Sequence, residues 1–460
     1  MKIYNTLTKN LEEFIPWNEN IVNMYTCGPT VYSYAHIGNL RTYIMEDILE
    51  KTLNYLGYNV RRCMNITDVG HLSSDSDTGN DKMVTSAKKE NKTVLDIAKF
   101  YTDAFFADTE KLNIKKPEIV APATENIDEY IKIIQKLLDT GYAYKAGGNI
   151  YFDTSKLEKY YVLTNVDENS LISAVRETVE EDINKKNKND FVLWFTKSKF
   201  DSQELKWDTP FGVGYPGWHI ECTGISLKNL GEHLDIHCGG VDNIFPHHTN
   251  EIAQSESFIG HPWCKYWVHA EHLNDKNGKM SKSSGESLTL STIEKHGYLP
   301  LAYRYMCLTS HYRNQLVFSY DALENAQNAY KKLKSRVLSL KEGGVFDREV
   351  FDKYNSLFKE SIGNDLNTSN AITLIYDLLK EDVSDVTKRS LIVEFDKVLS
   401  LDLTKKEELL NEDYIKEMIE KRNFAKQNKD YALADQIREE LLSLNIVLKD
   451  TREGTIYEVK

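Results

Sequence analysis

Two side chains four residues apart form the clearest candidate for part of a metal site. His247 and Glu251 lie in the segment FPHHTNEIAQ, and a helix that begins near Pro246 would place both on one face. Cys27 ends the apolar run NIVNMYTC at a Gly-Pro turn, and Cys222 lies in PGWHIEC, so two thiolates could complete a tetrahedral shell. A single cysteine is more often a small buried apolar side chain. The four residues together, in these neighbourhoods, favour one zinc ion per chain.

A second group of residues could bind a phosphate. The tetrapeptide HIGN occupies residues 36–39, where a strand–loop–helix turn is expected. Backbone N–H groups at a helix N-terminus attract phosphate, Gly38 allows a close approach, and His36 can donate to a phosphate oxygen. A histidine that caps the helix or packs against it explains the same residues, so the motif alone does not decide.

The segment KMSKS at residues 279–283 is far more specific. Lys279 and Lys282 lie among glycine and serine residues directly after an expected strand, which suits a mobile loop that brings positive charge onto a polyphosphate. The alternative is a solvated surface turn. Five consecutive residues in the right order after HIGN argue against that alternative.

Composition limits the class of protein. At 460 residues the chain should form several domains. The formal net charge of −13 argues against a generally basic nucleic-acid binder, although a local basic strip could still bind one RNA, because charge is screened beyond ~10 Å. Six scattered cysteines indicate a reducing compartment. With no signal-peptide core and no apolar run long enough to cross a bilayer, we expect a cytoplasmic protein without a membrane partner.

The candidate residues lie on a pattern typical of parallel sheets. Residues 21–27 indicate a strand, 39–56 a helix and 59–67 a second strand, which makes a β-loop-α-β unit. The alternation resumes from Pro216, with helices in WHIECTGISLKNL and HHTNEIAQSESF and strands in HLDIHCGG and KYWVHAEHL. We therefore predict an α/β fold with a Rossmann-like parallel sheet and a nucleotide site at the carboxyl end of its first strand.

The remaining segments predict how the sheet is interrupted and followed. Residues 142–207 change character, with Tyr-rich runs and a polar stretch, and indicate an insertion between two halves of one fold. After about residue 319 only helical patterns occur, and the last stretch indicates helix, helix and a short β hairpin. We expect six parts: the two halves of the sheet domain at 1–141 and 208–273, the connective insertion at 142–207, the KMSKS region at 274–318, an α-helical bundle at 319–402 and a small α+β unit at 403–460.

The two motifs, in this order on a split α/β fold, resemble the HIGH and KMSKS signatures of class I aminoacyl-tRNA synthetases. The segments MYTCGPTVY, PGWHIEC, DIHCGGVDNIFPHHTNEIAQ and SHYRNQL resemble the cysteinyl-tRNA synthetase family in particular. The resemblance extends to a C-terminal RxxAxxxKDYxxADxIR pattern at 422–438 and to DTREGTIY at 450–457. It therefore covers the whole chain.

The resemblance implies roles for particular residues. The zinc ligands would be Cys27, Cys222, His247 and Glu251. The residues at the ATP would be His36, Gly38, Asn39, Lys279, Met280, Ser281, Lys282 and Ser283. Among these, His36, Lys279 and Lys282 would be catalytic. Gly28, Thr67 and Trp218 would line the amino-acid pocket. Asp435, Arg438 and Asp450 would read splayed anticodon bases by their edges.

The implied reaction is ATP-dependent activation of L-cysteine as its adenylate, followed by transfer to the 3′ end of tRNA(Cys), with Mg²⁺ accompanying ATP. An apolar pocket separates cysteine from near-isosteric serine by only ~10²-fold. Zinc prefers thiolate to a neutral hydroxyl and lowers the pKa of the substrate thiol, so one Zn–S bond could supply the selectivity. A closed structural zinc site is the alternative. Within this family we expect a monomer, with the 274–318 region at the tRNA stem and the 403–460 unit at the anticodon.

Some positions depart from the family pattern. Asn39 stands where the HIGH signature ends in His, and because Asn can still donate a hydrogen bond we expect a changed contact there. Cys238 replaces a common Gly, and Thr249 stands where Glu often follows the paired histidines. The segment 67–83 is longer than in many members, which leaves open what lies over the pocket.

Two other functions fit parts of the sequence. A cysteine ligase that gives cysteine to a small amine would keep the zinc and the adenylate chemistry, but it would not need the C-terminal unit. A non-catalytic RNA-binding relative with a structural zinc would not need the intact KMSKS segment. Both remain open at the level of sequence.

Overall fold

The computed structural model describes residues 1–69, 82–90, 92–164, 182–197, 204–275, 278–279, 288–406, 412–428, 430–443, 446–451 and 454–459. The chain divides into two compact units, Met1–Thr404 and Lys405–Lys460, which are described separately. No helix among these residues has the length and apolar character needed to span a membrane.

A five-stranded sheet forms the centre of the first unit. Its order is β11-β10-β3-β4-β5, and every neighbouring pair is parallel. The strands are β3 (Val22–Thr26), β4 (Val60–Ile66), β5 (Ile119–Pro122), β10 (Leu234–Gly240) and β11 (Cys264–Ala270). The chain runs outward from β3 in one direction and from β10 in the other, so the strand order reverses between them. The predicted split parallel sheet is confirmed, and the boundary between β3 and β10 is where such sheets bind ligands.

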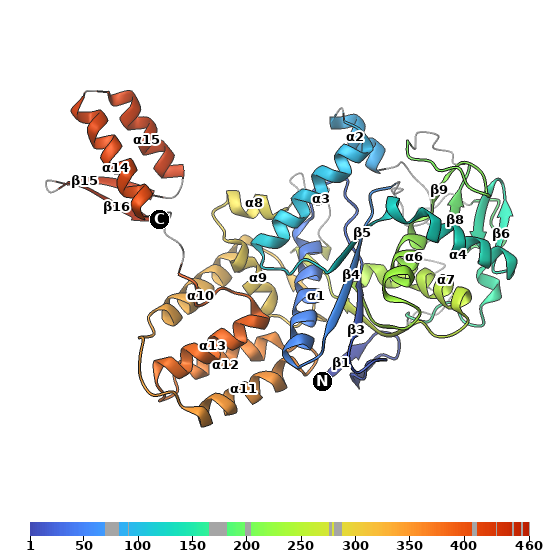
Figure 1. The fold of residues 1–460 in the computed structure, drawn as a ribbon, viewed down its shortest axis with the longest axis horizontal. Helices are drawn as coiled ribbons and strands as arrows, with labels where there is room; N and C mark the ends of the chain where they lie inside the picture. The colour runs from blue at the N-terminus through green and yellow to red at the C-terminus, as the bar shows by residue number, and fades with distance from the viewer. Residues whose placement is uncertain are drawn as a thin grey trace. The chain divides into compact units, whose positions relative to one another are not determined.

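Helices cover both faces of the sheet because alternate strand residues point to opposite sides. Met24 and Met64 pack with the helix α1 (Ile37–Tyr55) in one core cluster. Their neighbours Tyr25 and Cys63 pack with α6 (Trp218–Leu230) in another. Figure 1 shows α1 on one side of the strands, and α6, α7 (Thr249–Ile259) and α4 (Ile127–Asp139) on the other.

The edge strand β5 does not follow from the sequence pattern, which is helical on both sides of it. Its four residues lie between α3 (Val94–Lys111) and α4, and it pairs with β4 from Cys63↔Ile119 to Ile66↔Pro122. A strand this short carries no measurable alternation, and proline is tolerated at its end only because the strand lies at the edge.

A second sheet stands where the insertion was predicted. It contains β6 (Ala143–Ala146), β7 (Asn149–Phe152), β8 (Phe191–Phe195) and β9 (Tyr215–Pro216), all antiparallel. Stacked aromatic pairs such as Phe152–Phe191, with centroids 5.1 Å apart, hold it together. The sheet thus extends past residue 207, the predicted end of the insertion.

Short elements surround the two sheets. They are β1 (Lys2–Asn5), β2 (Asn10–Glu13), α2 (Lys82–Glu90), β12 (Leu273–Asp275), β13 (Gly278–Lys279), α8 (Leu290–Lys295), α9 (Pro300–Leu308) and β14 (Leu316–Val317). Strand β12 pairs with both β13 and β14, so the start of the KMSKS segment belongs to a small three-stranded sheet.

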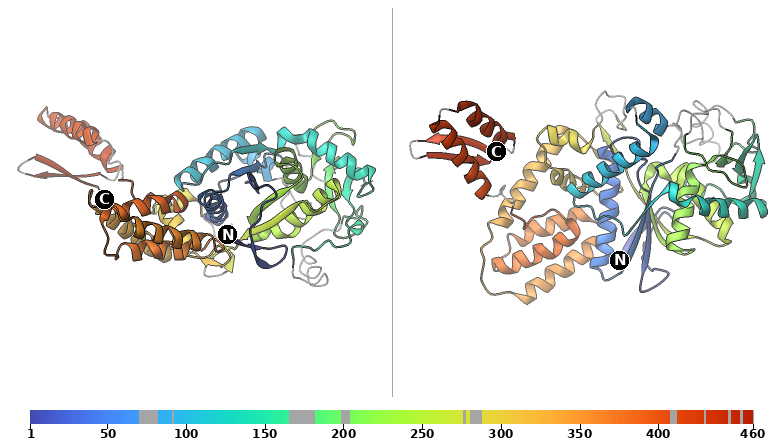
Figure 2. Two further views of the ribbon diagram at one scale, coloured as in Figure 1. Left: turned by 60° about the horizontal axis from the view of Figure 1, so that its bottom comes forward. Right: turned by 45° about the horizontal axis from the view of Figure 1, so that its top comes forward.

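The helical patterns after residue 319 form four helices, which Figure 2 shows grouped together. They are α10 (Tyr320–Leu338), α11 (Arg348–Ile362), α12 (Thr368–Leu378) and α13 (Asp385–Leu399). Each begins after a residue whose side chain accepts a hydrogen bond from the backbone three residues later, which satisfies an otherwise unpaired N–H group. The four caps are Ser319, Asp347, Asn367 and Ser384.

The second unit has the predicted order of helix, helix and hairpin. Its elements are α14 (Glu412–Gln427), α15 (Tyr431–Ser443), β15 (Ile446–Thr451) and β16 (Gly454–Val459). Ile415, Ile437 and Leu448 belong to its own buried core, which is separate from the cores of the first unit.

Candidate active site and metal centre

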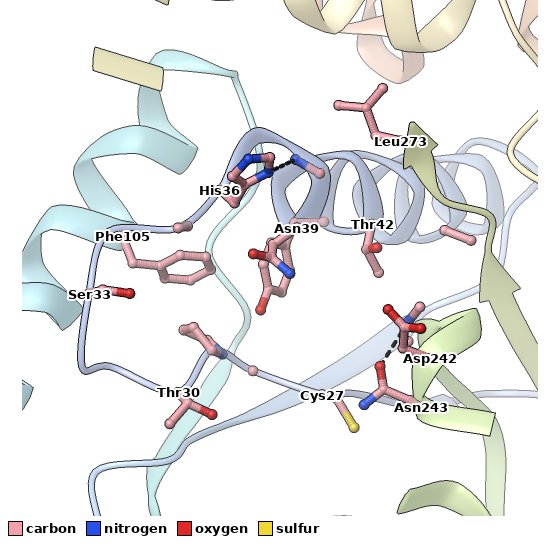
Figure 3. A pocket seen from close by; sticks show the side chains of 18 of the residues that line it. Cys27, Thr30, Ser33, His36, Asn39, Thr42, Phe105, Asp242, Asn243 and Leu273 are labelled. Carbon is pink, nitrogen blue, oxygen red and sulfur yellow. Dashed lines mark hydrogen bonds between the residues drawn. The ribbon is translucent and has the colours of Figure 1, made fainter. Parts of the chain in front are cut away.

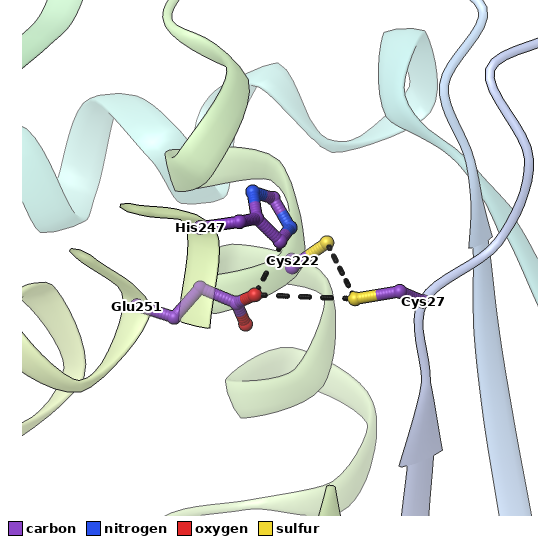
Figure 4. A group of neighbouring side chains, drawn as sticks. All are labelled: Cys27, Cys222, His247 and Glu251. Atoms are coloured by element: carbon purple, nitrogen blue, oxygen red, sulfur yellow. Dashed lines mark hydrogen bonds and ion pairs between the residues drawn. The ribbon is translucent and has the colours of Figure 1, made fainter. Parts of the chain in front are cut away.

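Three separate elements bring the four predicted metal ligands together (Figure 4). Cys27 directly follows β3, Cys222 lies in the second turn of α6, His247 lies just before α7, and Glu251 lies in the first turn of α7. Their candidate ligand atoms all lie within 4.8 Å of one another. The regular α-helix begins at Thr249, and the chain before it bends at Phe245, whose backbone is extended with φ of −140° and ψ of 131°.

The geometry of the four side chains fits a zinc ion. For Zn–S bonds of ~2.3 Å in a tetrahedron, two sulfurs lie ~3.8 Å apart; the Cys27 and Cys222 sulfurs are 3.9 Å apart. For Zn–N and Zn–O bonds of ~2.0 Å the corresponding separation is ~3.3 Å; His247 Nε2 and Glu251 Oε1 are 3.0 Å apart. The donor set and its spacing therefore suit this metal.

Four further histidines, which the sequence reasoning did not single out, surround the cluster. His219 Nδ1 shares a hydrogen bond of 2.9 Å with His247 Nδ1, so His247 is held with Nε2 toward the other ligands. His237 Nε2 contacts Glu251 Oε2 at 2.8 Å. His248 Nε2 lies 3.3 Å from the Cys27 sulfur, and its Nδ1 shares a hydrogen bond with His269.

A second donor set arises from these neighbours. Cys27, His237, His248 and Glu251 also satisfy the distance requirement for a metal. Two sequence features could have revealed this second donor set: the paired histidines in FPHH and a histidine in β10. Contacts of this kind to the outer side of a ligand fix its orientation and raise its basicity.

Burial and mutual charge set the protonation of the cluster. Burial works to raise the pKa of the Cys222 thiol, but hydrogen bonding with Cys27 and the charge of His247 lower that pKa to about 6. Burial lowers the pKa of His247, yet Glu251 and Cys222 raise it to about 10. Burial raises the pKa of Glu251, and His237 and His247 lower it to about 2. Burial, followed by contact with Cys222, raises the pKa of the Cys27 thiol well above its usual value. The Cys222 thiolate and the Glu251 carboxylate are therefore the anions beside a protonated His247.

A cavity of about 530 Å³ extends from the metal cluster to the HIGN segment. Cys27 and Gly28 line it, as do His36, Gly38 and Asn39. Figure 3 shows Asn39 pointing from α1 into the cavity, with Asp242 and Asn243 on the opposite side. The cavity lies at the carboxyl ends of β3 and β10, as predicted for a nucleotide site.

The HIGN residues also shape the start of α1. His36 is the N-cap, and its Nδ1 accepts a hydrogen bond of 3.1 Å from the Gly38 N–H group. A Cβ at position 38 would lie 3.3 Å from that nitrogen, so any larger residue there would require the His36 ring to shift. The capping role that the sequence left open is therefore present, and His36 still lines the cavity.

The connection between β11 and β12 is held by a residue that the sequence reasoning missed. Arg41 on α1 is only 3% exposed. Its guanidinium donates to the backbone oxygens of Glu271 and His272 at 2.7 and 2.6 Å, and to Asn314 at 2.6 Å. One buried cation thus ties the HIGN helix to the cavity wall that leads into β12.

Residues expected in the amino-acid pocket lie close to the metal cluster. At Gly28 a Cβ would lie 1.6 Å from the carbonyl oxygen of Asn65, so only glycine lets this loop approach β4 so closely. Thr67 is buried and donates to Glu221 at 2.8 Å. The Trp218 ring stacks on His247 with centroids 4.3 Å apart. Of the three, Gly28 alone is among the residues that line the cavity.

The KMSKS residues are described only in part. The Lys279 backbone pairs with Asn274 in the β12–β13 hairpin, which starts at the cavity residue Leu273. The Lys279 side chain and residues Met280, Ser281, Lys282 and Ser283 lie outside the described residues.

The predicted tRNA-reading residues all lie in the second unit. Asp435 and Arg438 are exposed on α15. Asp450 on β15 accepts a bidentate pair of hydrogen bonds from Arg422, at 2.9 and 3.0 Å, and another from Lys426. The Arg422 hydrogen bonds, followed by that of Lys426, hold the pKa of Asp450 well below its usual value.

Comparisons with known proteins agree with this architecture. A family model for the catalytic domain of tRNA synthetases class I (C) matches residues 13–328. The cysteine–tRNA ligase of Treponema denticola is 46% identical over 100% of this chain and 99% of its own length. That of Borrelia turicatae is 43% identical over 99% of this chain and 98% of its own length.

A solved structure shares the fold at low identity. The methionyl-tRNA synthetase of Mycobacterium tuberculosis, bound by methionyl-adenylate, superposes with a TM-score of 0.56 at 15% identity over 83% of this chain and 90% of that one. The parallel sheet and the matching family model define a class I tRNA synthetase. Within that class, the chain belongs to the cysteine–tRNA ligase family.

Proposed function

We propose that this chain activates L-cysteine with ATP to cysteinyl-adenylate and transfers the cysteinyl group to the 3′ end of tRNA(Cys). One observation carries the proposal: Cys27 belongs both to the four converging donor side chains and to the cavity that the HIGN residues line. A site that selects a thiol and a site that holds a nucleotide would then share one cavity. Forming a mixed anhydride between an amino acid and AMP requires that arrangement.

In the first step, a carboxylate oxygen of cysteine bonds to the α-phosphorus of ATP, and pyrophosphate leaves as the opposite P–O bond breaks. The chain contributes position and charge rather than a covalent intermediate. The backbone N–H groups at the start of α1 and the His36 side chain are proposed to bind phosphate oxygens. Lys279 and Lys282 are proposed to stabilise the charge on the leaving pyrophosphate, together with Mg²⁺ brought by ATP.

Zinc is the proposed resident metal, held by Cys27, Cys222, His247 and Glu251. When bound, it would favour a thiolate over a hydroxyl and lower the pKa of the substrate thiol. The chain's own residues prepare the site, because His219 orients His247 and the Cys222 thiol already has a pKa of about 6. The alternative is a structural zinc ion that is held by the same four ligands and does not bind the substrate.

Glu251 is the proposed ligand that yields to the substrate. Its second oxygen, Oε2, contacts His237 at 2.8 Å, so the carboxylate has an alternative partner within the protein. The corresponding contact of the Cys27 sulfur, with His248 Nε2, is longer at 3.3 Å. X-ray absorption that detects no new metal–sulfur scattering when cysteine is added would contradict this role.

The second unit is the proposed reader of the anticodon. Asp435 and Arg438 are exposed and could reach base edges. Asp450 is less available for hydrogen bonds to bases, because Arg422 and Lys426 already donate to both of its carboxylate oxygens. The finer division of the first unit, with a stem-contact region at 274–318 and a bundle at 319–402, remains a prediction, as do a monomeric state and a cytoplasmic location.

The experiment for the proposal is ATP–pyrophosphate exchange with each amino acid in turn, followed by charging of a tRNA(Cys) transcript. We expect exchange with cysteine and charging of this tRNA. Exchange without charging would favour a ligase that uses a small amine, and absent exchange in metal-replete protein would favour a non-catalytic relative.

A further inference from the structure

Arg41 is a buried cation with an unusual set of partners. Its side chain is only 3% exposed, and all of its hydrogen-bond acceptors among the described residues are backbone oxygens. Arg304 on α9 is also buried, but it pairs with the carboxylate of Asp47 at 2.7 Å. Neutral acceptors offset the cost of burying a charge less fully than an ion pair does. The positions of the Arg41 acceptors, rather than charge balance, therefore explain this residue.

The four acceptors lie on two segments that are far from Arg41 in the sequence. Nη1 donates to the oxygens of Glu271 and His272 at 2.7 and 2.6 Å. Nη2 donates to the oxygens of His311 and Asn314 at 3.3 and 2.6 Å. The first segment runs directly into β12 and the second leads into β14, and these two strands pair in parallel. One guanidinium therefore holds the entrances of both strands to α1.

The small sheet that contains these strands also carries the first lysine of the KMSKS segment. Strand β12 pairs with β13, where Asn274 lies opposite Lys279. Leu273, at the start of β12, lies close to the start of α1, because a Cβ at Gly38 would be 3.7 Å from the Leu273 Cβ (Figure 3). A shift of this sheet against α1 would therefore move the Lys279 backbone relative to the HIGN residues.

The segment that leads into β14 is also fixed on its other side. The Tyr312 hydroxyl donates to Asp365 at 2.6 Å, and the Arg313 guanidinium donates to the same carboxylate at 2.7 Å. Asp365 is buried and lies between α11 and α12 of the helical bundle. The backbone that Arg41 binds is thus anchored to the bundle. Arg41 therefore sets the separation between an anchored segment and the helix that begins with HIGN.

The chain that follows the KMSKS segment contacts the start of α1 as well. The Ile37 N–H group donates to the Leu288 oxygen at 2.8 Å, and His36 forms an antiparallel bridge with Thr289. The first two turns of α1 therefore hold described residues on both sides of the KMSKS segment.

We infer that Arg41 is a positioning residue for adenylate formation, an inference that rests on the function proposed above. It is not a catalytic residue, because its hydrogen bonds go to the protein backbone. By holding β12 and β14 to α1, it places Lys279 at the distance from the HIGN residues that one polyphosphate spans. A misplacement of ~1 Å can lower a reaction rate ~10²-fold. Loss of Arg41 should therefore lower the turnover number for activation and leave the metal cluster and the affinity for cysteine unchanged.

The first test measures pyrophosphate exchange in full-length, metal-replete Arg41→Met and Arg41→Lys. The turnover number is expressed per active site, counted from the burst of adenylate formed, so that loss of folded protein does not enter. We expect Arg41→Met to lower it about 10²-fold, with the KM for cysteine within about twofold of wild type and one zinc ion per chain. In Arg41→Lys the donors leave from one nitrogen and cannot reach both segments, so we expect a loss of at least about tenfold.

Arg304→Met and Arg304→Lys are the matched controls, because they remove the donors of a buried arginine that does not bind the small sheet. We expect their turnover numbers per active site to stay within about threefold of wild type. Where a methionine variant does not fold, the lysine pair decides. Equal losses at the two positions would show that Arg41 only stabilises the fold, and wild-type turnover in Arg41→Lys would show that its charge alone suffices. Either result would overturn the inference.

The second test is a double-mutant cycle with the lysine that Arg41 is inferred to place. If Arg41 acts through Lys279, its removal should matter less once that lysine is gone. We expect Arg41→Met to cost less than about fivefold in a Lys279→Ala background, and the full ~10²-fold in a Lys295→Ala background, where an exposed lysine of α8 is lost instead. The same loss in both backgrounds would overturn the inference alone. Absent exchange in the wild-type protein would overturn the proposed function, and the inference with it.

Discussion

Two buried polar clusters in the first unit differ in how their charges are matched. In one, Arg62 bonds to Glu46 at 3.0 Å and to Glu50 at 3.3 Å, and Lys115 bonds to Glu50 at 2.6 Å. In the metal cluster, the ion pairs of Glu251 within the described residues are all to histidines. In the first cluster the positive charge comes from the side chains of Arg62 and Lys115. In the metal cluster it comes from histidine, which can lose its proton.

The source of the positive charge distinguishes a structural role for the Arg62 cluster from a functional role for the metal cluster. An arginine is always protonated, so Arg62 supplies the positive charge of its cluster without any ligand. A divalent metal binds neutral imidazole, thiolate and carboxylate. His247 must therefore lose its proton when a metal binds, and the metal then supplies the positive charge. Burial alone therefore does not mark a functional site; the exchangeable charge does.

The largest expected effect comes from breaking the metal cluster. Cys222→Ala should abolish zinc binding and lower cysteine-dependent exchange by ~10³-fold or more, since losing even an outer partner of a ligand costs 10–100-fold. Metal analysis and exchange kinetics measure the two losses. Cys63→Ala is the control, because Cys63 is equally buried on β4 but lies outside both donor sets. Equal losses in the two variants would refute the metal role of Cys222.

Breaking the structural cluster should affect stability rather than metal content. Arg62→Met leaves buried Glu46 without a cation and Glu50 with Lys115 alone, so we expect the free energy of unfolding to fall by ~3–5 kcal/mol. Arg61→Met is the control, since Arg61 is exposed on the same strand and should change stability by less than ~0.5 kcal/mol. Urea titration measures both. Zinc content of the folded fraction should stay at one ion per chain, and its loss would show that the clusters are not independent.

The nucleotide end of the cavity should respond differently from the metal end. Lys282→Ala should lower the activation rate ~10²–10³-fold, with a smaller effect on cysteine affinity, because the lysine acts on charge that develops in the transition state. Lys295→Ala removes an exposed lysine on α8 and serves as the control. Pyrophosphate exchange at varied cysteine and ATP concentrations separates the two parameters. An unchanged exchange rate would remove Lys282 from the mechanism.

The smallest effect is a pH dependence confined to the structural cluster. Burial, which outweighs the charge of Arg62, raises the pKa of Glu46 from 4.5 to about 8. The folded state therefore binds more protons than the unfolded state between these values, and this part of the stability falls as pH rises from about 5 to 8. We expect the free energy of unfolding to decline steadily over this range, measured by urea titration at several pH values. A decline of the same size in Glu46→Gln would assign it to another group.

The sequence predicted the split sheet because its long strands and helices carry strong periodicity, as in β4 and α1. It also predicted that the four candidate ligands lie together. The spacing of His247 and Glu251 places that pair on one helix face, and the two cysteines followed from their sequence neighbourhoods. It did not predict β5, whose four residues are too few to show a pattern.

The outer histidines escaped prediction for a different reason. His219, His237 and His269 meet only through the packing of α6, β10 and β11, and no spacing in the sequence records that contact. Arg41 was missed in the same way, because its partners are backbone oxygens some 230 to 273 residues further along the chain.

The most direct test of the central claim is the ratio of pyrophosphate exchange with cysteine to exchange with serine, measured on zinc-loaded and on chelator-treated protein. The account predicts a ratio well above the ~10² that an apolar pocket supplies when zinc is bound, and a collapse of cysteine-dependent exchange when zinc is removed. Comparable exchange with serine, or full selectivity in protein that carries no metal, would contradict it.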